Sequence, residues 1–437
     1  MRRLPDLAPS RPLRILPQAE RILSNGLTVI AIARRTVPLV ELRLHMPFAG
    51  DDLAVGSVLT QTLFAGSDKR SIGEIATELQ TVGGTLGASL DPDRLQISGN
   101  CLFSGLDRML ELLAEVLNSA AYPLTEVARE RERLAERIRI ARSQPSFLAR
   151  AALHRQIYGT HPYAIPTPDA AKVREVHVDQ LRRLHAKRVR PHGATLVLVG
   201  DFDPDHAVDA AVRRLSSWSG RGPAGILPPT PPLIPGPLTL VDRPNAVQSS
   251  LRMALPAATR DSPDNAPLQL ANLIFGGYFP SRWVENIRET MGYAYSPHSS
   301  IEHNPAGSLM LLTAEMATEV TAPVLVETLY ELGRLATIPP RKEELEQARQ
   351  YALGSLLLGM STQAGIAGLA IKFAGSGLRL PYLREHAQRL TDATVDDVHR
   401  AAATYMAPTQ AVSLVLGAST RVQDDLAKIV PVAPIPL

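Results

Sequence analysis

Residues 222–237 read GPAGILPPTPPLIPGP and hold seven of the 36 prolines in this chain of 437 residues. Proline lacks a backbone N–H donor and fixes φ, so this stretch can form neither a helix nor a central strand. We interpret residues 221–237 as a stiff, extended linker. Because the linker lies near the middle of the chain, it predicts two domains of similar size, 1–220 and 238–437, and an internal repeat between them.

The repeat is visible near the end of each half. The first half carries VDQL at 178–181, a helical stretch, Pro191 and ATLVLVG at 194–200; the second carries VDDV at 395–398, a helical stretch, Pro408 and AVSLVLG at 411–417. The pairs Val178/Val395, Asp179/Asp396, Pro191/Pro408 and Gly200/Gly417 each lie 217 residues apart. The order indicates a helix with an aspartate in its N-cap region, a proline stop, a buried strand and a glycine turn, repeated by duplication.

Each half also opens with two stretches typical of strands. They cover 27–32 and 40–46 in the first half, and 238–241 and 249–255 in the second. Residues 106–120 and 124–141 have helical patterns, the latter with Glu and Arg at helical spacing. The sequence therefore predicts an α+β fold of two homologous domains, each a mostly antiparallel sheet covered by helices, joined by the proline-rich linker.

Composition excludes several classes of protein. The chain has 46 basic and 43 acidic residues, which excludes a nucleic-acid binder that depends on a large basic surface. With 45% hydrophobic residues it is not typical of a disordered protein. No apolar run approaches 18 residues and no apolar leader follows the basic N-terminus, so we expect no membrane helix and a cytoplasmic location.

Familiar catalytic and metal motifs are missing. The single cysteine, Cys101, excludes a disulfide framework and a Cys-based metal site, and we interpret it as a buried thiol. No His-x-x-x-His or His-Glu-x-x-His occurs among the eleven histidines, and His298 with His303 is not interpreted as a metal site. The chain also lacks Gly-x-Ser-x-Gly, a P-loop and a strand-borne Gly-x-Gly-x-x-Gly.

One local pattern is specific. FGGYFPSR at 275–282 is followed by WVENIRE at 283–289 and MGYAYS at 291–296, so a double glycine leads into an amphipathic helix and a glycine turn into an aromatic strand. This resembles the C-terminal-domain signature of the short, two-domain pitrilysin/insulinase-type metallopeptidases, the group that includes mitochondrial processing peptidase. The resemblance extends over nearly the whole chain, through SNGLTV (24–29), LFAGSDKRS (63–71), GGTLGA (83–88), HPY (161–163) and VGDF (199–202).

The family's inverted zinc motif, His-x-x-Glu-His, is absent from the place where the resemblance puts it. Its three residues fall on Ser57, Thr60 and Gln61, and the third ligand, a glutamate, falls on Arg137. A shift of one residue would restore Glu136 but not the histidines. Zinc needs several N, O or S ligands converging on one point, and a general base to activate its water. The resemblance therefore implies a chain that holds no metal or other cofactor and cannot hydrolyse peptides alone.

Two other parts of the family's site are present. The resemblance assigns to Arg288 and Tyr295 the Arg/Tyr pair that donates hydrogen bonds to the substrate; from the residues alone, a solvated Arg288 and a core Tyr295 remain open. It also places an edge strand for an extended peptide near Gly83, Gly84, Gly87 and Ala88, or in the counterpart of a sister chain.

These features lead to one hypothesis and two alternatives. We expect the zinc-less subunit of a heterodimeric zinc metallopeptidase that cleaves peptides, with Arg288 and Tyr295 opposite a zinc ion held by the His-x-x-Glu-His of a sister subunit. The first alternative is an inert structural or scaffold subunit. The second is a module that binds peptides without cleaving them.

Overall fold

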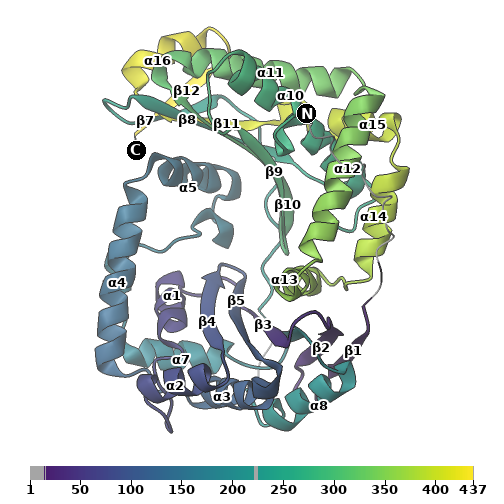
Figure 1. Ribbon diagram of the computed structural model, residues 1–437. Coiled ribbons are helices and arrows are strands. Elements are labelled where there is room, and N and C mark those ends of the chain that lie inside the picture. Colours follow the sequence, from purple (N-terminus) through teal and green to yellow (C-terminus); the bar gives the residue numbers. More distant parts are fainter. Residues whose placement is uncertain (1–13, 15, 221–224, 437) are drawn as a thin grey trace, which may run out of the picture.

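The computed structural model describes residue 14, residues 16–220 and residues 225–436. It forms two α+β domains, each built on a mixed six-stranded sheet covered by helices (Figure 1). Residues 225–236 of the linker form neither helix nor strand, as their prolines predict, and residues 221–224 lie outside the described part. Thr230 donates its backbone N–H to Ala306 O at 2.9 Å, so the linker is held against the second domain.

The first sheet has the strand order β1-β2-β6-β3-β5-β4. Only β2 and β6 pair in parallel. The strands are β1 (Gln18–Ile22), β2 (Thr28–Ala33), β3 (Leu39–Pro47), β4 (Thr85–Asp91), β5 (Arg94–Leu102) and β6 (Thr195–Gly200). The helices are α1 (Leu53–Thr62), α2 (Ile72–Thr81), α3 (Leu106–Ser119), α4 (Leu124–Arg142), α5 (Pro145–Tyr158), α6 (Ala170–Arg174), α7 (Val178–Arg188) and α8 (Pro204–Leu215).

The second sheet has the order β12-β7-β11-β8-β10-β9, which repeats the first. Its strands are β7 (Leu238–Asp242), β8 (Gln248–Pro256), β9 (His298–Asn304), β10 (Gly307–Ala317), β11 (Val412–Gly417) and β12 (Val432–Ile435). Its α-helices are α9 (Asn265–Asn272), α10 (Arg282–Val284), α11 (Thr321–Thr337), α12 (Lys342–Gly359), α13 (Gln363–Ala374), α14 (Tyr382–Asp392), α15 (Val395–Tyr405) and α16 (Ser419–Ala427). The outermost strand differs between the sheets: β1 runs antiparallel to β2, whereas β12 runs parallel to β7.

Short helical segments complete the chain. Single 3₁₀ turns cover Phe103–Gly105, Pro162–Ala164, Thr318–Val320 and Pro408–Gln410. Two π-helical segments cover Leu273–Gly277 and Glu285–Thr290. In the described part of the chain, no single helix is both long and apolar enough to cross a membrane; α12 and α13 meet both conditions only together, and they bend by 106° at the break between them.

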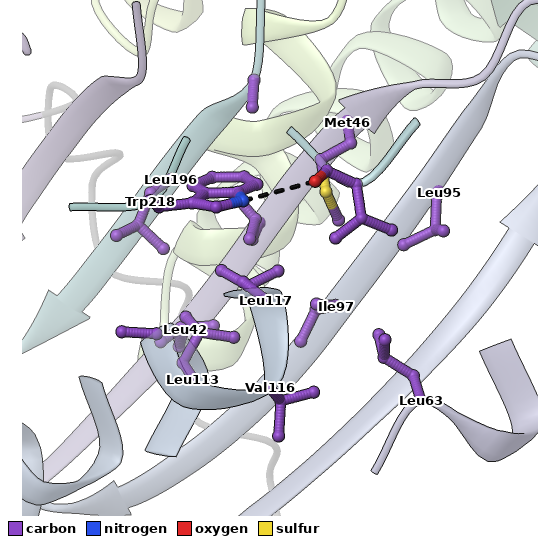
Figure 2. Close-up of a cluster of buried hydrophobic side chains, with 14 of the residues drawn as sticks. Leu42, Met46, Leu63, Leu95, Ile97, Leu113, Val116, Leu117, Leu196 and Trp218 are labelled. Carbon is purple, nitrogen blue, oxygen red and sulfur yellow. Dashed lines mark hydrogen bonds between the residues drawn. The ribbon is translucent and has the colours of Figure 1, made fainter. Parts of the chain in front are cut away.

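The core of the first domain lies between its sheet and α3 (Figure 2). The two-residue period of β3 turns Leu42 and Met46 to this core and Glu41 and Arg43 to the other face of the sheet. Trp218 is fully buried and donates its indole N–H to the carbonyl of Val189 at 3.3 Å, which satisfies its polar atom. Strand alternation thus produces one apolar and one partly polar face.

The duplication extends to individual side chains. Arg43 on β3 donates Nη1–H to the carbonyls of Leu42 (2.7 Å) and Gly99 (3.2 Å). Arg252 on β8 does the same with Leu251 (2.8 Å) and Ala314 (3.5 Å). Asp179 and Asp396, expected in the N-cap region, lie in the first turns of α7 and α15, where a carboxylate is favourable beside the positive end of the helix dipole.

Each domain lends one helix to the other. On the face of the first sheet away from its own core, α13 places Ile366, Ala370 and Phe373 beside buried residues of β2 and β6. On the corresponding face of the second sheet, α5 places Ala149 and Leu153 beside buried residues of β8 and β11. Figure 1 shows these two helices reaching across between the domains. The two halves are therefore interlocked by apolar burial and are not merely tethered by the linker.

This exchange predicts that a change in α13 weakens both domains. Ile366 is fully buried against the first sheet, so Ile366→Ala should lower the free energy of unfolding by about 3 kcal/mol in a single cooperative transition, measured by urea denaturation. Leu358→Ala, at a position 74% exposed on α12, is the control and should change it by less than about 0.5 kcal/mol. Two separate transitions, with only one shifted, would show that the domains are energetically independent.

Candidate functional site

The segment that carries Arg288 is held by its buried neighbours. Trp283 and Ile287 are fully buried, and the ring of Trp283 stacks on Phe275 with centroids 5.3 Å apart. The indole N–H of Trp283 donates to Thr328 Oγ1 at 3.0 Å. Because the helix around Ile287 is of the π type, it accommodates an extra residue per turn, a feature often found at functional sites. Arg288 follows Ile287 directly and its side chain lies at the surface, 30% exposed.

The expected aromatic strand after the glycine turn is wrong. Gly292 has a φ of +65°, as the turn requires, but residues 293–296 form no strand and β9 begins only at His298. The amides of Tyr293 and Ala294 both donate to the carbonyl of Ile287, at 2.8 and 3.2 Å, and so are unavailable to a sheet. Only an isolated bridge joins Ala294 to Met316. Tyr295 therefore stands in a loop.

The structure brings Arg288 and Tyr295 together. The guanidinium lies 5.0 Å from the centroid of the Tyr295 ring and 4.7 Å from that of Phe279, within cation–π range of both. Tyr295 is 81% exposed, so the interpretation of this residue as a core aromatic is wrong. Arg288 Nε also pairs with Glu289 Oε1 at 3.1 Å. A guanidinium and a phenol are thus presented side by side at the surface.

A buried ion pair anchors the start of this segment. Arg282 Nε and Nη2 donate to Glu344 Oε1 and Oε2 at 2.7 and 2.8 Å, and the two side chains are only 9% and 13% exposed. Burial alone would raise the pKa of Glu344, but the hydrogen bonds from Arg282 and from the backbone N–H of Arg341 lower it to about 2. Sequence reasoning quoted Arg282 in the motif but missed Glu344, which lies on α12 and has no signal of its own.

Two of the four positions of the degenerate metal motif are joined in the structure. Ser57, Thr60 and Gln61 lie on α1 and Arg137 lies on α4. Arg137 Nη2 donates to Gln61 Oε1 at 2.7 Å, and Thr60 donates its hydroxyl to the carbonyl of Ser57 at 2.9 Å. Glu136 pairs instead with Arg139 on its own helix. Arg137, and not Glu136, is therefore the residue that faces α1.

These residues do not fit a zinc ion. They offer two hydroxyls, an amide and a guanidinium, none of which is a usual ligand of zinc in proteins, and the Gln61 oxygen already accepts from Arg137. Elsewhere in the described residues, no group of three or more His, Cys, Asp or Glu side chains is placed to hold a metal. Cys101 is buried as expected, and burial, with a smaller effect of Glu41, raises the pKa of its thiol to about 12.

The glycine-rich stretch lies at a sheet edge. Gly83 and Gly84 precede β4, which contains Gly87 and Ala88 and pairs in the structure only with β5. Gly83 has a φ of +57°, and a Cβ on Gly84 would lie 2.8 Å from the carbonyl oxygen of Asn100, so both positions need glycine. A Cβ on Gly56 of α1 would lie 2.7 Å from the Leu90 side chain, which shows that α1 packs closely on β4. The edge therefore adjoins the helix that carries Gln61.

Both domains of the chain match models of one protein family, and proteins of similar length match most of the chain. Residues 55–170 match the family described as "Insulinase (Peptidase family M16)", and residues 175–351 match "Peptidase M16 inactive domain". A protein of Mycobacterium tuberculosis (strain ATCC 25618 / H37Rv) described as an uncharacterized zinc protease is 25% identical over 373 residues, 82% of this chain and 83% of that protein. One from Rickettsia bellii with the same description is 22% identical over 352 residues, 78% and 84% of the two chains.

Solved structures share the fold. The crystal structure of a peptidase M16 inactive domain from Pseudomonas fluorescens superposes with a TM-score of 0.83 at 24% identity, covering 92% of this chain and 98% of that one. A protease from Helicobacter pylori superposes with a TM-score of 0.84 at 19% identity, covering 92% and 100%.

The Arg282–Glu344 pair predicts a pH-dependent contribution to stability. Glu344→Gln should lower the free energy of unfolding at pH 7 by about 2 kcal/mol, because a charged hydrogen-bond partner is lost. The pKa of Glu344 is about 2 in the folded chain against an ordinary value of 4.5, so the ion pair stabilises the fold above pH 4.5 and its contribution is lost as the pH falls toward 2. In urea titrations, the difference in the free energy of unfolding between the wild type and Glu344→Gln should shrink by about half between pH 7 and pH 3. A difference that stays constant between pH 7 and pH 3 would contradict the assigned role of the Glu344 carboxylate. Glu346→Gln, at a half-exposed position on the same helix, is the control variant.

Proposed function

This chain is a two-domain member of the M16 (insulinase/pitrilysin) peptidase family, and from that premise we propose that it is the zinc-less subunit of a heterodimeric metallopeptidase. Its relatives are described as zinc proteases, whereas its own residues at the family's metal positions do not fit zinc. We infer that the chain is inactive alone and completes the site of a sister subunit.

The observation that carries the proposal is the hydrogen bond between Arg137 and Gln61. Arg137 stands where the resemblance places a ligand glutamate, so a position that needs a negative charge holds a positive one. A guanidinium is always protonated in a protein and repels a divalent cation. The bond also occupies the Gln61 oxygen, and α1 and α4 stay joined at this point without an ion. A side-chain hydrogen bond thus spans the place where the resemblance puts the ion.

What the chain contributes to catalysis is the Arg288–Tyr295 pair. Both side chains can donate hydrogen bonds to a peptide carbonyl and to the oxyanion that develops when the carbonyl is attacked. Such a donor stabilises a transition state by roughly 3–4 kcal/mol when it is held in place before the reaction. Here the guanidinium contacts the rings of both Phe279 and Tyr295, which restricts its motion and reduces the conformational entropy lost on binding substrate.

The partner we propose is a member of the same family that carries His-x-x-Glu-His with its zinc. The substrate we propose is an extended peptide, which can add as a further strand to an exposed sheet edge through main-chain hydrogen bonds. The free edge of β4, next to the α1 helix, is the edge this chain would offer. Exposed side chains at Thr85, Gly87 and Ser89 are small, so they leave room beside that edge.

The first test concerns metal and activity. The purified chain should contain less than about 0.1 zinc per molecule and should cleave no peptide, because it lacks ligands for the ion. The variant Ser57→His/Thr60→Glu/Gln61→His/Arg137→Glu should bind one zinc, since Gln61 on α1 and Arg137 on α4 already face each other and the change restores the full motif. Atomic absorption and a fluorogenic peptide library measure the two outcomes. Chelator-sensitive cleavage by the wild-type chain alone would overturn the proposal.

The second test uses the complex with the sister subunit. Arg288→Ala and Tyr295→Phe should each lower kcat on the order of 100-fold while the complex still assembles, because each removes one donor to the oxyanion. Arg139→Ala, which removes an exposed arginine of α4 paired only with Glu136, should leave kcat unchanged. Full turnover by both site variants would favour the inert scaffold, and peptide binding without cleavage by the wild-type complex would favour the capture module.

A further inference from the structure

The second sheet is covered incompletely on the face that α5 occupies. One helix is about 10 Å wide, whereas six strands at about 4.8 Å spacing span roughly 24 Å. The buried stripe of α5 contacts the middle of the sheet. On the side toward β7 and β12, the structure leaves a cavity of about 520 Å³ between α5, residues 164–167 and these two strands.

The corresponding place in the first domain is filled. There α13 takes the position of α5, and the hollow toward β1 has only about 20 Å³. Met360 stands three residues before α13, where Arg142 stands three residues before α5. Leu369 is the seventh residue of α13, where Ala151 is the seventh of α5. The duplicated fold thus carries large apolar side chains in one copy and smaller or charged ones in the other.

The same contrast recurs after the helix. Tyr382 is followed by Leu383, which lines the small hollow, whereas Tyr163 is followed by Ala164, which lines the large cavity. Both tyrosines follow a proline, and each Pro-Tyr pair comes after the exchanged helix of its half. The cavity is therefore a consequence of specific substitutions and not of the architecture, because the same architecture closes the hollow in the other domain.

The lining of the cavity selects a chemical class of ligand. Its walls are mainly apolar, among them Phe147, Leu148 and Val241, and the lining contains no Asp or Glu. Three arginines border it. Arg142 pairs with Asp169, but the guanidinium groups of Arg150 and Arg155 form neither an ion pair nor a hydrogen bond with any described residue. An apolar interior with uncompensated guanidinium groups at its border is complementary to a carboxylate on an apolar body.

Two kinds of molecule carry that chemistry, a fatty acid and the C-terminal residue of an apolar peptide. A peptide brings amide groups that need hydrogen-bond partners when they leave water. The only neutral polar side chains in the lining are Gln156, Thr167 and Thr239. An aliphatic chain needs no partners, and the volume lies within the range of about 300–1,000 Å³ that is usual for small-molecule sites.

We propose that this cavity binds a fatty acid, with the aliphatic chain along α5 and β7 and the carboxylate at Arg150 and Arg155. The site lies apart from the Arg288–Tyr295 pair in the sequence and shares no residue with it. Binding at this cavity does not require a sister subunit. The fatty-acid proposal can therefore be wrong while the proposed peptidase role is right, and the peptidase role can be wrong while the fatty-acid proposal is right.

Titration of the purified chain with dodecanoate tests the proposal, by calorimetry or by displacement of a fluorescent fatty acid. Dodecanoate should bind at one site per chain, and affinity should rise by roughly threefold for each methylene added from octanoate to dodecanoate, as apolar burial requires. Dodecanol should bind at least about tenfold more weakly, because the carboxylate is lost. No binding, equal binding of dodecanol, or tighter binding of a short peptide ending in leucine would each overturn it.

Variants locate the site. Arg150→Gln/Arg155→Gln should weaken dodecanoate binding by about tenfold or more and leave dodecanol unaffected. Ala151→Leu introduces the side chain found at this place in α13 and should weaken both ligands by filling the cavity. Arg139→Gln on α4 and Ala403→Leu at an exposed position of α15 are the matched controls. Dodecanoate binding unchanged in both site variants, with melting temperatures like that of the wild type, would place the fatty acid elsewhere and overturn the proposal.

Discussion

Each six-stranded sheet of this protein has two faces to remove from water, and the remaining structure depends on how the second face is covered. The inner strands β2 and β6 are apolar along nearly their whole length, as strands buried on both faces are. The second face is covered by a helix from the other half of the chain, α13 on the first sheet and α5 on the second. This reciprocal burial makes one molecule of two similar domains and sets their relative orientation.

The duplication lets equivalent places diverge without loss of the fold. The pair Arg43 and Arg252 has kept the same hydrogen bonds in both copies. The small hollow in the first domain is lined by Met360 and Leu383, whereas the large cavity in the second has Arg142 and Ala164 in its lining. In each case the helix and sheet geometry is retained, and only the chemistry of the side chains at one place changes.

The candidate site was predictable only in part. The spacing of the resemblance assigned Gln61 and Arg137 to one site, and the structure joins their side chains by a hydrogen bond between α1 and α4. The resemblance also paired Arg288 with Tyr295, which lies seven residues further along the chain beyond a glycine turn. The stretch 293–296 was predicted as a strand because alternating aromatic residues usually pair in sheets, but the carbonyl of Ile287 accepts both local amides first. Phe279 and Glu344, which hold the pair and its segment in place, were not predicted.

By itself the sequence determined the irregular backbone of linker residues 225–236, the repeat, and the positions of six strands (β2, β3, β6, β7, β8 and β11) and four helices (α3, α4, α7 and α15). Proline chemistry and periodicity are local properties, so they can be read without the fold. Tertiary structure alone decided which sheet α5 and α13 cover, that the 30% exposed Arg288 contacts two aromatic rings, and that the hollow in the second domain is open. The physical reason is that helix periodicity shows which side of a helix is buried but does not show which sheet or helix that side packs against. Packing partners are chosen by the free energy of the whole chain, in which distant segments compete for the same apolar surface.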